Sequence, residues 1–264
     1  MQQYGLKHIP ERTKQPRSNG LTMVMDKGLS IREVEDMLSI ANVHIDIVKL
    51  GWATSLVSND LEKKINAYKS AKIPVYFGGT LFEAFVIRKQ FDDYRRLLNK
   101  YGITYAEVSD GSIEINHDIK CQYIADLSRE FTVLSEVGSK DADKIIPPYK
   151  WIEFMKKELQ AGSYKLIAES REAGNVGIFR GTGEVRSGLV DEILTQVSAD
   201  DIIWEAPQKS QQVYFVKLIG SNVNLGNIAP AEVIPLETVR LGLRGDTFMD
   251  FLPKSYKSHP ITTK

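Results

Sequence analysis

Short apolar runs, each long enough for one β-strand, alternate with amphipathic stretches along most of this chain. The runs lack strict alternation with polar residues, which is typical of parallel strands that are buried on both faces. Eight such runs predict strands at residues 21–26, 45–51, 75–79, 105–109, 132–136, 166–169, 202–205 and 222–225. The spacing between most neighbours leaves room for one helix, which predicts repeated β-α units.

Helix signals fill the segments between these runs. Ser30 and Thr80 each precede a glutamate by three positions, Glu33 and Glu83, which is the pattern of a capping box at a helix N-terminus. Apolar residues three or four apart predict further helices at residues 59–71, 117–130, 151–160, 185–197 and 208–219. The helical pattern after Thr80 runs towards Tyr101, in one helix or in two.

Eight β-α units in 264 residues favour a single α/β domain that closes into a (β/α)8 TIM-type barrel with parallel strands. We expect the barrel over about residues 20–250, a polar N-terminal segment at 1–19 and a polar C-terminal tail at 251–264. The alternative is an open, doubly wound sheet. Such a sheet usually carries a G-x-G-x-x-G turn after its first strand, whereas this turn contains only Gly28, so a nicotinamide cofactor is not indicated.

Composition narrows the classes of function. The 34 basic and 34 acidic residues cancel, so the basic footprint of a nucleic-acid-binding protein is missing. The N-terminal segment lacks the apolar core of a secretory signal, and no apolar run approaches the roughly 18 residues of a membrane span. We therefore expect a cytoplasmic protein with no nucleic-acid or membrane partner. Cys121, the only cysteine, lies in a predicted helix and is interpreted as a packed side chain rather than a nucleophile.

Three of the predicted strands end in a glutamate that is followed two or four residues later by a basic residue. The glutamates are 33 and 36 positions apart, a period that suits one strand and its helix. The pairs are Glu136 with Lys140, Glu169 with Arg171, and Glu205 with Lys209. Side chains two or four apart share one face of an extended strand, so each pair points into the barrel mouth if the strands continue that far. Structural salt bridges explain one pair equally well, but three consecutive pairs favour a functional site.

The C-terminal ends of the strands form the active site in this fold, so the residue types there indicate its chemistry. Carboxylates without nearby histidine or cysteine suit a hard cation, which predicts Mg²⁺ held by some of Glu136, Glu169 and Glu205. The basic residues then indicate a polyanionic substrate. None of the four histidines falls at a predicted strand end, so a histidine base is not expected.

A lysine can replace histidine in proton transfer when neighbouring cations and partial burial lower its pKa. We predict Lys140 as the proton donor, with Lys49 as the second candidate. Lys27 is the third, although anion binding is its better interpretation. The other predicted substrate-binding residues are Arg171, Arg186, Lys209, Asn224 and Asn227.

Two glycine-rich segments, residues 174–183 and 220–227, carry backbone N–H groups that are suited to binding an oxyanion. Neither matches a P-loop. The second lies near the last strand, where barrel enzymes often bind phosphate. The first is either a mobile lid or an ordinary surface loop.

Seven segments in consistent order between Gly20 and Thr247 carry a family resemblance. They are GLTMVMDKG at 20–28, VKLGW at 48–52, GGTLFE at 78–83, EVGSK at 136–140, EAPQK at 205–209, NVNLGN at 222–227 and LGLRGDT at 241–247. Together they resemble the phosphosulfolactate synthase family. The resemblance implies a Mg²⁺-dependent (β/α)8 barrel that adds sulfite to phosphoenolpyruvate, giving (2R)-2-phospho-3-sulfolactate.

On this resemblance we expect a lyase of sulfolactate biosynthesis, a carbon–sulfur bond-forming synthase that works as a homo-oligomer on two small molecules. Lys140 would protonate C2 of the enolate-like species, while Arg171, Arg186 and Lys209 hold phosphate or sulfite. Two alternatives stay open: a non-catalytic, stress-associated barrel of the same family, and a related barrel enzyme that uses phosphoenolpyruvate with another nucleophile. Retention of all three Glu-basic pairs favours catalysis.

Overall fold

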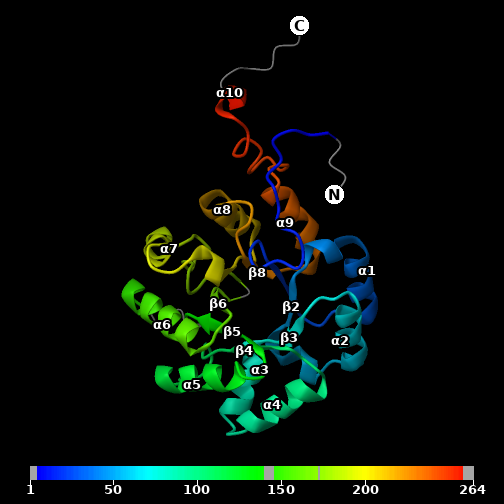
Figure 1. Ribbon diagram of the computed structural model, residues 1–264, viewed down its shortest axis with the longest axis vertical. Helices are drawn as coiled ribbons and strands as arrows, with labels where there is room; N and C mark the ends of the chain where they lie inside the picture. Colours follow the sequence, from blue (N-terminus) through cyan, green and yellow to red (C-terminus); the bar gives the residue numbers. More distant parts are fainter. Residues whose placement is uncertain (1–4, 140–145, 172, 258–264) are drawn as a thin grey trace.

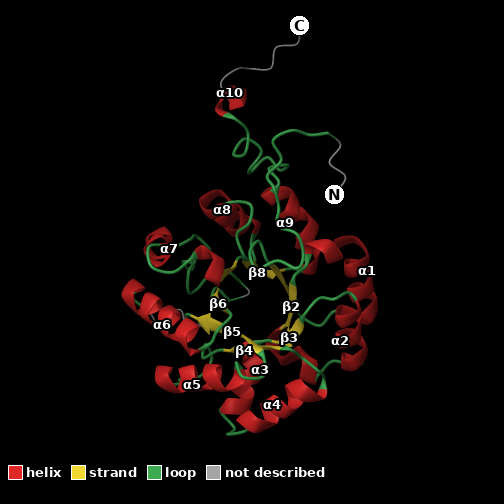
Figure 2. Cartoon of the chain, in the orientation of Figure 1, coloured by secondary structure: helices red, strands yellow, loops and turns green. Residues whose placement is uncertain are grey.

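Eight parallel strands form a ring at the centre of the computed structural model, which describes residues 5–139, 146–171 and 173–257 (Figure 1 and Figure 2). They are β1 (Thr22–Asp26), β2 (Ile47–Leu50), β3 (Val75–Phe77), β4 (Tyr105–Val108), β5 (Thr132–Val137), β6 (Lys165–Ala168), β7 (Ile202–Glu205) and β8 (Leu225–Ile228). The hydrogen-bonded order is β3-β2-β1-β8-β7-β6-β5-β4. The ring is nearly closed, since the end strands β3 and β4 lie side by side. The predicted (β/α)8 barrel is confirmed.

Most of the helices surround this ring (Figure 2). The α-helices in the described part of the chain are α1 (Ile31–Ala41), α2 (Leu61–Ser70), α3 (Gly79–Val86), α4 (Phe91–Lys100), α5 (His117–Leu127), α6 (Pro148–Ala161), α7 (Ser187–Leu194), α8 (Lys209–Ile219), α9 (Val233–Arg240) and α10 (Lys254–Lys257). The last of these, α10, lies apart from the ring (Figure 1). None of the described helices has the length and apolar character to cross a membrane.

The two predicted capping boxes have different outcomes. Ser30 caps α1 as predicted, because its hydroxyl accepts from the Glu33 N–H and the Ser30 N–H donates to the Glu33 carboxylate at 2.7 Å. The box at Thr80 is wrong, because α3 already begins at Gly79 and Thr80 lies inside it. The helical pattern that follows forms two helices, α3 and α4.

Side-chain hydrogen bonds join β3 to β4, where no backbone ladder connects the two strands in the described residues. Glu107 of β4 accepts from the Tyr76 hydroxyl of β3 at 2.8 Å and from the Gly79 N–H at 2.5 Å. The carboxylate of Glu83 in α3 accepts from the hydroxyl of Ser109, just after β4. Buried carboxylates therefore help to close this side of the barrel.

The last strand lies three residues later than predicted, at Leu225–Ile228 rather than 222–225. Asn224 is used instead to fasten the N-terminal end of the barrel: its Oδ1 accepts from the Leu21 N–H and its Nδ2 donates to the Asp200 carbonyl, both at 3.0 Å. The prediction that Asn224 lies at the C-terminal mouth is therefore wrong. Asn227, within β8, lies close to the mouth instead.

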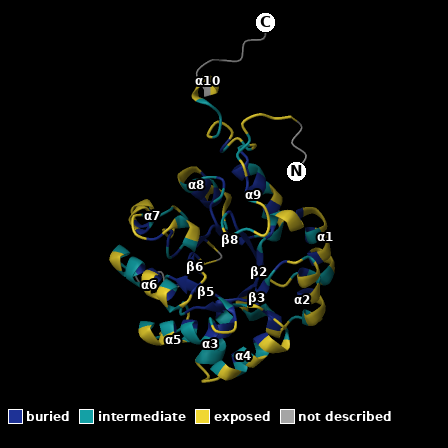
Figure 3. Cartoon of the chain, in the orientation of Figure 1, coloured by how far each residue is buried: buried dark blue, intermediate teal, exposed yellow. Residues whose placement is uncertain are grey.

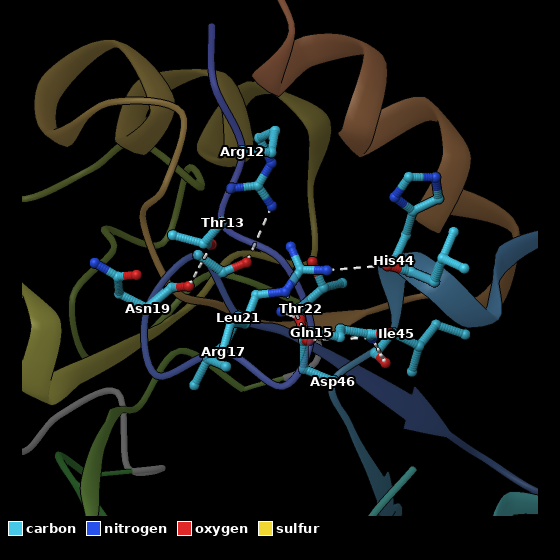
Figure 4. Close-up of polar contacts among 12 residues, drawn as sticks. Arg12, Thr13, Gln15, Arg17, Asn19, Leu21, Thr22, His44, Ile45 and Asp46 are labelled. Carbon is cyan, nitrogen blue, oxygen red and sulfur yellow. Dashed lines mark hydrogen bonds and ion pairs between the residues drawn. The ribbon is translucent and has the colours of Figure 1, made fainter. Parts of the chain in front are cut away.

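The N-terminal segment packs across the N-terminal end of the barrel (Figure 4). Arg17 Nε lies 2.9 Å from Asp46 Oδ1, just before β2. Arg12 is almost fully buried and donates to Glu237 Oε1 of α9 at 2.9 Å. These contacts fix part of the predicted polar segment to the barrel.

Buried residues follow the strands and the inner faces of the helices, while exposed residues lie on the outer helix faces (Figure 3). Trp204 of β7 is completely buried and stacks on Phe215 of α8, with ring centroids 4.9 Å apart. Cys121 of α5 is partly buried, and burial raises the pKa of its thiol. A raised pKa lowers the thiolate fraction, which agrees with the interpretation of Cys121 as a packing residue.

The buried guanidinium of Arg240 supplies a stability prediction. It donates to the carbonyls of Ser221 at 2.8 Å, Val223 at 2.6 Å and Leu21 at 3.1 Å. Replacing Arg240 with Met leaves buried carbonyl oxygens without their donor, so we expect the free energy of unfolding in urea to fall by more than about 2 kcal/mol. The matched control is Arg129→Met, at a side chain 76% exposed, which should change it by less than about 0.5 kcal/mol. Equal stability of the two variants would contradict the prediction.

Candidate active site

A cavity of about 790 Å³ opens at the C-terminal ends of the strands. The structure brings six of the predicted site residues together in its lining: Lys49, Glu136, Glu169, Arg171, Glu205 and Asn227. Residues from β2, β5, β7 and β8 and from the loop after β6 therefore face one space. Four carboxyl-bearing residues line it, since Glu107 of β4 joins the three predicted glutamates.

Lys49 lies at the centre of these carboxylates. Its Nζ is 3.1 Å from Glu107, 3.4 Å from Glu136 and 3.5 Å from Glu205, and the residue is 5% exposed. Burial alone would lower the pKa of Lys49, but the surrounding acidic groups, led by Glu107, raise it well above its usual value. Lys49 is therefore held as an ammonium, which suits electrostatic stabilisation better than proton donation.

Glu107 belongs to this cluster, although it is not among the site residues predicted from the sequence. It is completely buried and accepts from Tyr76 and Gly79 as well as facing Lys49. A charged residue inside an apolar strand is the signal that could have identified it, because an unpaired carboxylate is rarely buried. Glu107 thus connects the barrel seam to the candidate site.

Glu205, the last residue of β7, bridges two different environments. One oxygen lies 3.5 Å from Lys49 Nζ and the other accepts from the Ser170 N–H at 2.9 Å. Burial raises the pKa of Glu205 to about 7, against the opposing effect of Lys49, and the neighbouring Glu136 adds to the increase. A carboxyl group with this pKa can change its protonation state near neutral pH.

The predicted pairing of Glu205 with Lys209 is wrong. The strand ends at Glu205, and Lys209 is the first residue of α8, so the two side chains do not share an extended backbone. Lys209 is exposed and lies 3.0 Å from Asp246, while Glu205 faces Lys49. Side-chain alternation holds only along an extended backbone, and this condition also limits the pairing predicted after the preceding strand, β6.

Glu169 follows the end of β6, and the chain turns directly after it. The backbone of Arg171 is left-handed, with φ of 57°, and its N–H donates to the Glu169 carboxylate. Gly177 approaches so closely that a Cβ there would lie 2.0 Å from the Glu169 carbonyl oxygen. The extended geometry expected for Glu169 and Arg171 is therefore absent, although both residues still line the cavity.

The other predicted residues that the structure describes lie outside this lining. Lys140 falls outside the described residues. Lys27 follows β1, is exposed and holds its Nζ 5.1 Å from the ring centre of Trp52, which does line the cavity. Arg186 directly precedes α7, and its Nη1 donates to the Gly177 carbonyl at 3.1 Å.

The glycine-rich loop at 174–183 is anchored. Ile178 and Phe179 are buried in the core, and Gln211 of α8 donates to the carbonyls of Gly174 at 2.8 Å and Gly183 at 3.2 Å. Of the two interpretations, this geometry favours a packed surface loop over a lid.

The cavity offers oxygen donors of the type that a hard cation binds, and an excess of acidic over basic residues. The acidic lining residues are Glu107, Glu136, Glu169 and Glu205, against the cations Lys49 and Arg171. In the described part of the chain the buried Oδ1 of Asn227 has no hydrogen-bond partner, so it adds an available oxygen donor. The described residues hold no group of three acidic, histidine or cysteine side chains spaced for one metal ion. Mg²⁺ would then take one or two carboxylates, together with water and substrate, which is its usual mode of binding.

The sequence of this chain matches a known family over most of its length. Residues 10–246 match the family model described as (2R)-phospho-3-sulfolactate synthase (ComA). The chain belongs to this family. Membership in a family of synthases identifies it as an enzyme in the broad sense.

Curated relatives agree with the family match. A phosphosulfolactate synthase from Bacillus subtilis is 43% identical over 243 residues, covering 91% of this chain and 96% of the relative. A phosphosulfolactate synthase from Methanocaldococcus jannaschii is 45% identical over 235 residues, covering 87% and 94%.

Solved structures share the fold at low sequence identity. The 3-hexulose-6-phosphate synthase of Salmonella typhimurium has a TM-score of 0.53 at 16% identity, covering 85% of this chain and 100% of that chain. The 3-keto-L-gulonate-6-phosphate decarboxylase of Vibrio cholerae has a TM-score of 0.51 at 12% identity, covering 88% and 99%. These likenesses support the barrel fold alone.

The raised pKa of Glu205 predicts a pH dependence of stability. Between pH 4.5 and about 7 the folded protein keeps a proton on Glu205 that the unfolded chain releases, so the free energy of unfolding falls as pH rises through this window. Replacing Glu205 with Gln should remove this contribution, whose slope is at most about 1.4 kcal/mol per pH unit.

Urea unfolding at a series of pH values measures the difference between wild type and variant. The control Glu192→Gln, on an exposed position of α7, should follow the wild-type curve. Parallel curves for wild type and Glu205→Gln would contradict the assignment.

Proposed function

We propose that this chain is a phosphosulfolactate synthase that adds sulfite to phosphoenolpyruvate and forms (2R)-2-phospho-3-sulfolactate. The observation that carries the proposal is the family match over residues 10–246. The buried charge cluster at the mouth of the barrel supports it. The proposal includes the lyase class and a homo-oligomeric enzyme, which the family resemblance implies, and a cytoplasmic setting, which is expected from the composition of the sequence.

The charges of the cavity suit two anionic reactants. Phosphoenolpyruvate carries a carboxylate and a phosphate, and sulfite brings further negative charge. Arg171 lines the cavity and can bind an oxyanion through its planar guanidinium. Lys49 adds a fixed positive charge within the acidic group, where low exposure to water strengthens its field.

The acidic residues support a role for Mg²⁺ in the same cavity. Glu136, Glu169 and Glu205 are the carboxylates predicted to hold it, and Asn227 offers a further oxygen. When bound, Mg²⁺ would supply Lewis-acid stabilisation of the negative charge that builds up on the substrate. Lys49 limits the repulsion between these carboxylates by facing two of them.

The proposed reaction forms one bond between sulfur and carbon. The sulfur lone pair of sulfite attacks C3 of phosphoenolpyruvate, and the electrons of the C2–C3 double bond move towards C2 and the carboxylate. C2 then takes one proton from a protein group, for which Lys140 is our candidate. No bond to phosphate breaks, so the product keeps the phosphate ester.

A turnover assay tests the proposal. The purified protein, mixed with phosphoenolpyruvate, sulfite and Mg²⁺, should consume the enol ester and form one new phosphate ester, both followed by phosphorus NMR. Replacing Lys140 with Ala removes the proposed proton donor, so we expect turnover to fall by about 100-fold or more. The control Lys156→Ala changes an exposed lysine of α6 and should keep wild-type turnover.

Further arms of the same assay separate the parts of the proposal. Excess chelator should abolish turnover, and full activity without free metal would remove Mg²⁺ from the account. Turnover with another nucleophile but not with sulfite would instead identify a different reaction of phosphoenolpyruvate. No consumption of phosphoenolpyruvate under any condition would contradict the catalytic function.

A further inference from the structure

Trp52 has an environment unlike that of the other two tryptophans. Its side chain lies at the cavity and the residue is 51% exposed, whereas Trp151 and Trp204 are buried at 1% and 0% exposure. Large aromatic side chains usually bury most of their surface, and those left open beside a cavity often contact ligands. The position of Trp52 therefore calls for a physical reason.

The backbone after β2 directs Trp52 to the mouth of the barrel. A Cβ on Gly51 would lie 2.3 Å from the sulfur of Met25, so a larger residue there would require the Met25 side chain to move. Trp52 and Ala53 then follow with left-handed φ values of 54° and 53°. Residues other than glycine rarely adopt this conformation, so the surrounding structure must hold it in place. Thr54 fixes the turn, because its hydroxyl donates to the Gly51 carbonyl at 2.8 Å.

Lys27 meets Trp52 from the neighbouring strand. β1 and β2 pair in parallel with Asp26 opposite Leu50, so the residues that follow them leave the sheet at the same end. Asp26 fixes the turn that carries Lys27, since its Oδ1 accepts from the N–H groups of Gly28 and Leu29, both at 2.8 Å. The ammonium then lies 5.1 Å from the ring centre of Trp52, within the range of a cation–π interaction.

Lys27 and Trp52 make the rim of the cavity differ in charge from its floor. The floor is acidic around Lys49, and the carboxylates there suit a metal ion and the carboxylate that it binds. Trp52 lines the cavity and is half exposed, and the exposed Lys27, which is not part of the lining, lies over its ring. A lysine ammonium binds phosphate as a point charge, so the edge suits the phosphate end of an elongated substrate.

We propose that Trp52 is a positioning residue that holds the Lys27 ammonium at the rim, and that the pair forms an outer binding site for the phosphate group of a phosphorylated carboxylic acid. The inference deepens the proposed function and relies on it for the identity of the acid. Binding at the rim needs no turnover, so the two can be tested separately.

Tryptophan fluorescence tests the rim site in the full chain. Trp52 is the exposed tryptophan, so addition of phosphoenolpyruvate without sulfite should change the emission saturably, and Trp52→Phe should lose this change. Inorganic phosphate should compete, whereas pyruvate should not. Lys27→Met keeps Trp52 as the fluorescent reporter. The apparent dissociation constant for phosphoenolpyruvate should rise about fivefold, a size typical of one exposed cation–π-assisted contact.

A kinetic comparison separates positioning from a purely structural role. Trp52→Leu should raise KM for phosphoenolpyruvate about fivefold with a smaller change in kcat, and Trp52→Phe, which keeps a ring, should restore most of the loss. The control Lys63→Met, at a side chain 69% exposed on α2, should match wild type. Emission that does not respond to phosphoenolpyruvate, or an unchanged dissociation constant in Lys27→Met, would overturn the inference. A normal fluorescence response without turnover would keep the rim site and reject the proposed reaction.

Discussion

A lysine ammonium buried among carboxylates is the interaction on which the mouth of this barrel depends. Lys49 comes from β2, whereas Glu107, Glu136 and Glu205 come from β4, β5 and β7, so one charge connects strands around the ring. Buried carboxylates repel one another and lose hydration, and only close pairing and hydrogen bonds offset that cost. The cluster is therefore set in place by folding, before any substrate binds, which is the condition for electrostatic catalysis.

The same carboxylates serve the fold and the candidate site. Glu107 accepts hydrogen bonds from Tyr76 and Gly79 across the β3–β4 seam, and it also faces Lys49. Glu205 accepts from the loop after β6 through the Ser170 N–H. Because Glu107 and Glu205 each have a structural partner, replacing either of them is expected to change the stability of the fold as well as the chemistry of the cavity.

Much of the architecture can be predicted from the sequence, because buried parallel strands produce apolar runs with few ambiguities. The strand β8 is the exception. Asn224 was predicted at the C-terminal end of this strand, yet it forms hydrogen bonds at the N-terminal end of the barrel. The predicted pairing of site residues depended on how far each strand stays extended. β7 stops at Glu205, so parity could not extend to Lys209, which pairs with Asp246. Lys49, the ion-pair partner of Glu205, lies 156 residues away in the sequence. The sequence indicates such a distant contact only by placing a lysine inside an apolar run.

The most direct test of the account is the pH dependence of stability in Lys49→Met. Removing the ammonium leaves the facing carboxylates unpaired, so the free energy of unfolding in urea should fall by about 3–5 kcal/mol at neutral pH. The loss should shrink as pH is lowered towards about 5, because the folded state then gains protons on those carboxylates more readily than the unfolded chain does. A variant as stable as wild type at neutral pH, or a loss that is independent of pH, would contradict the central role of Lys49.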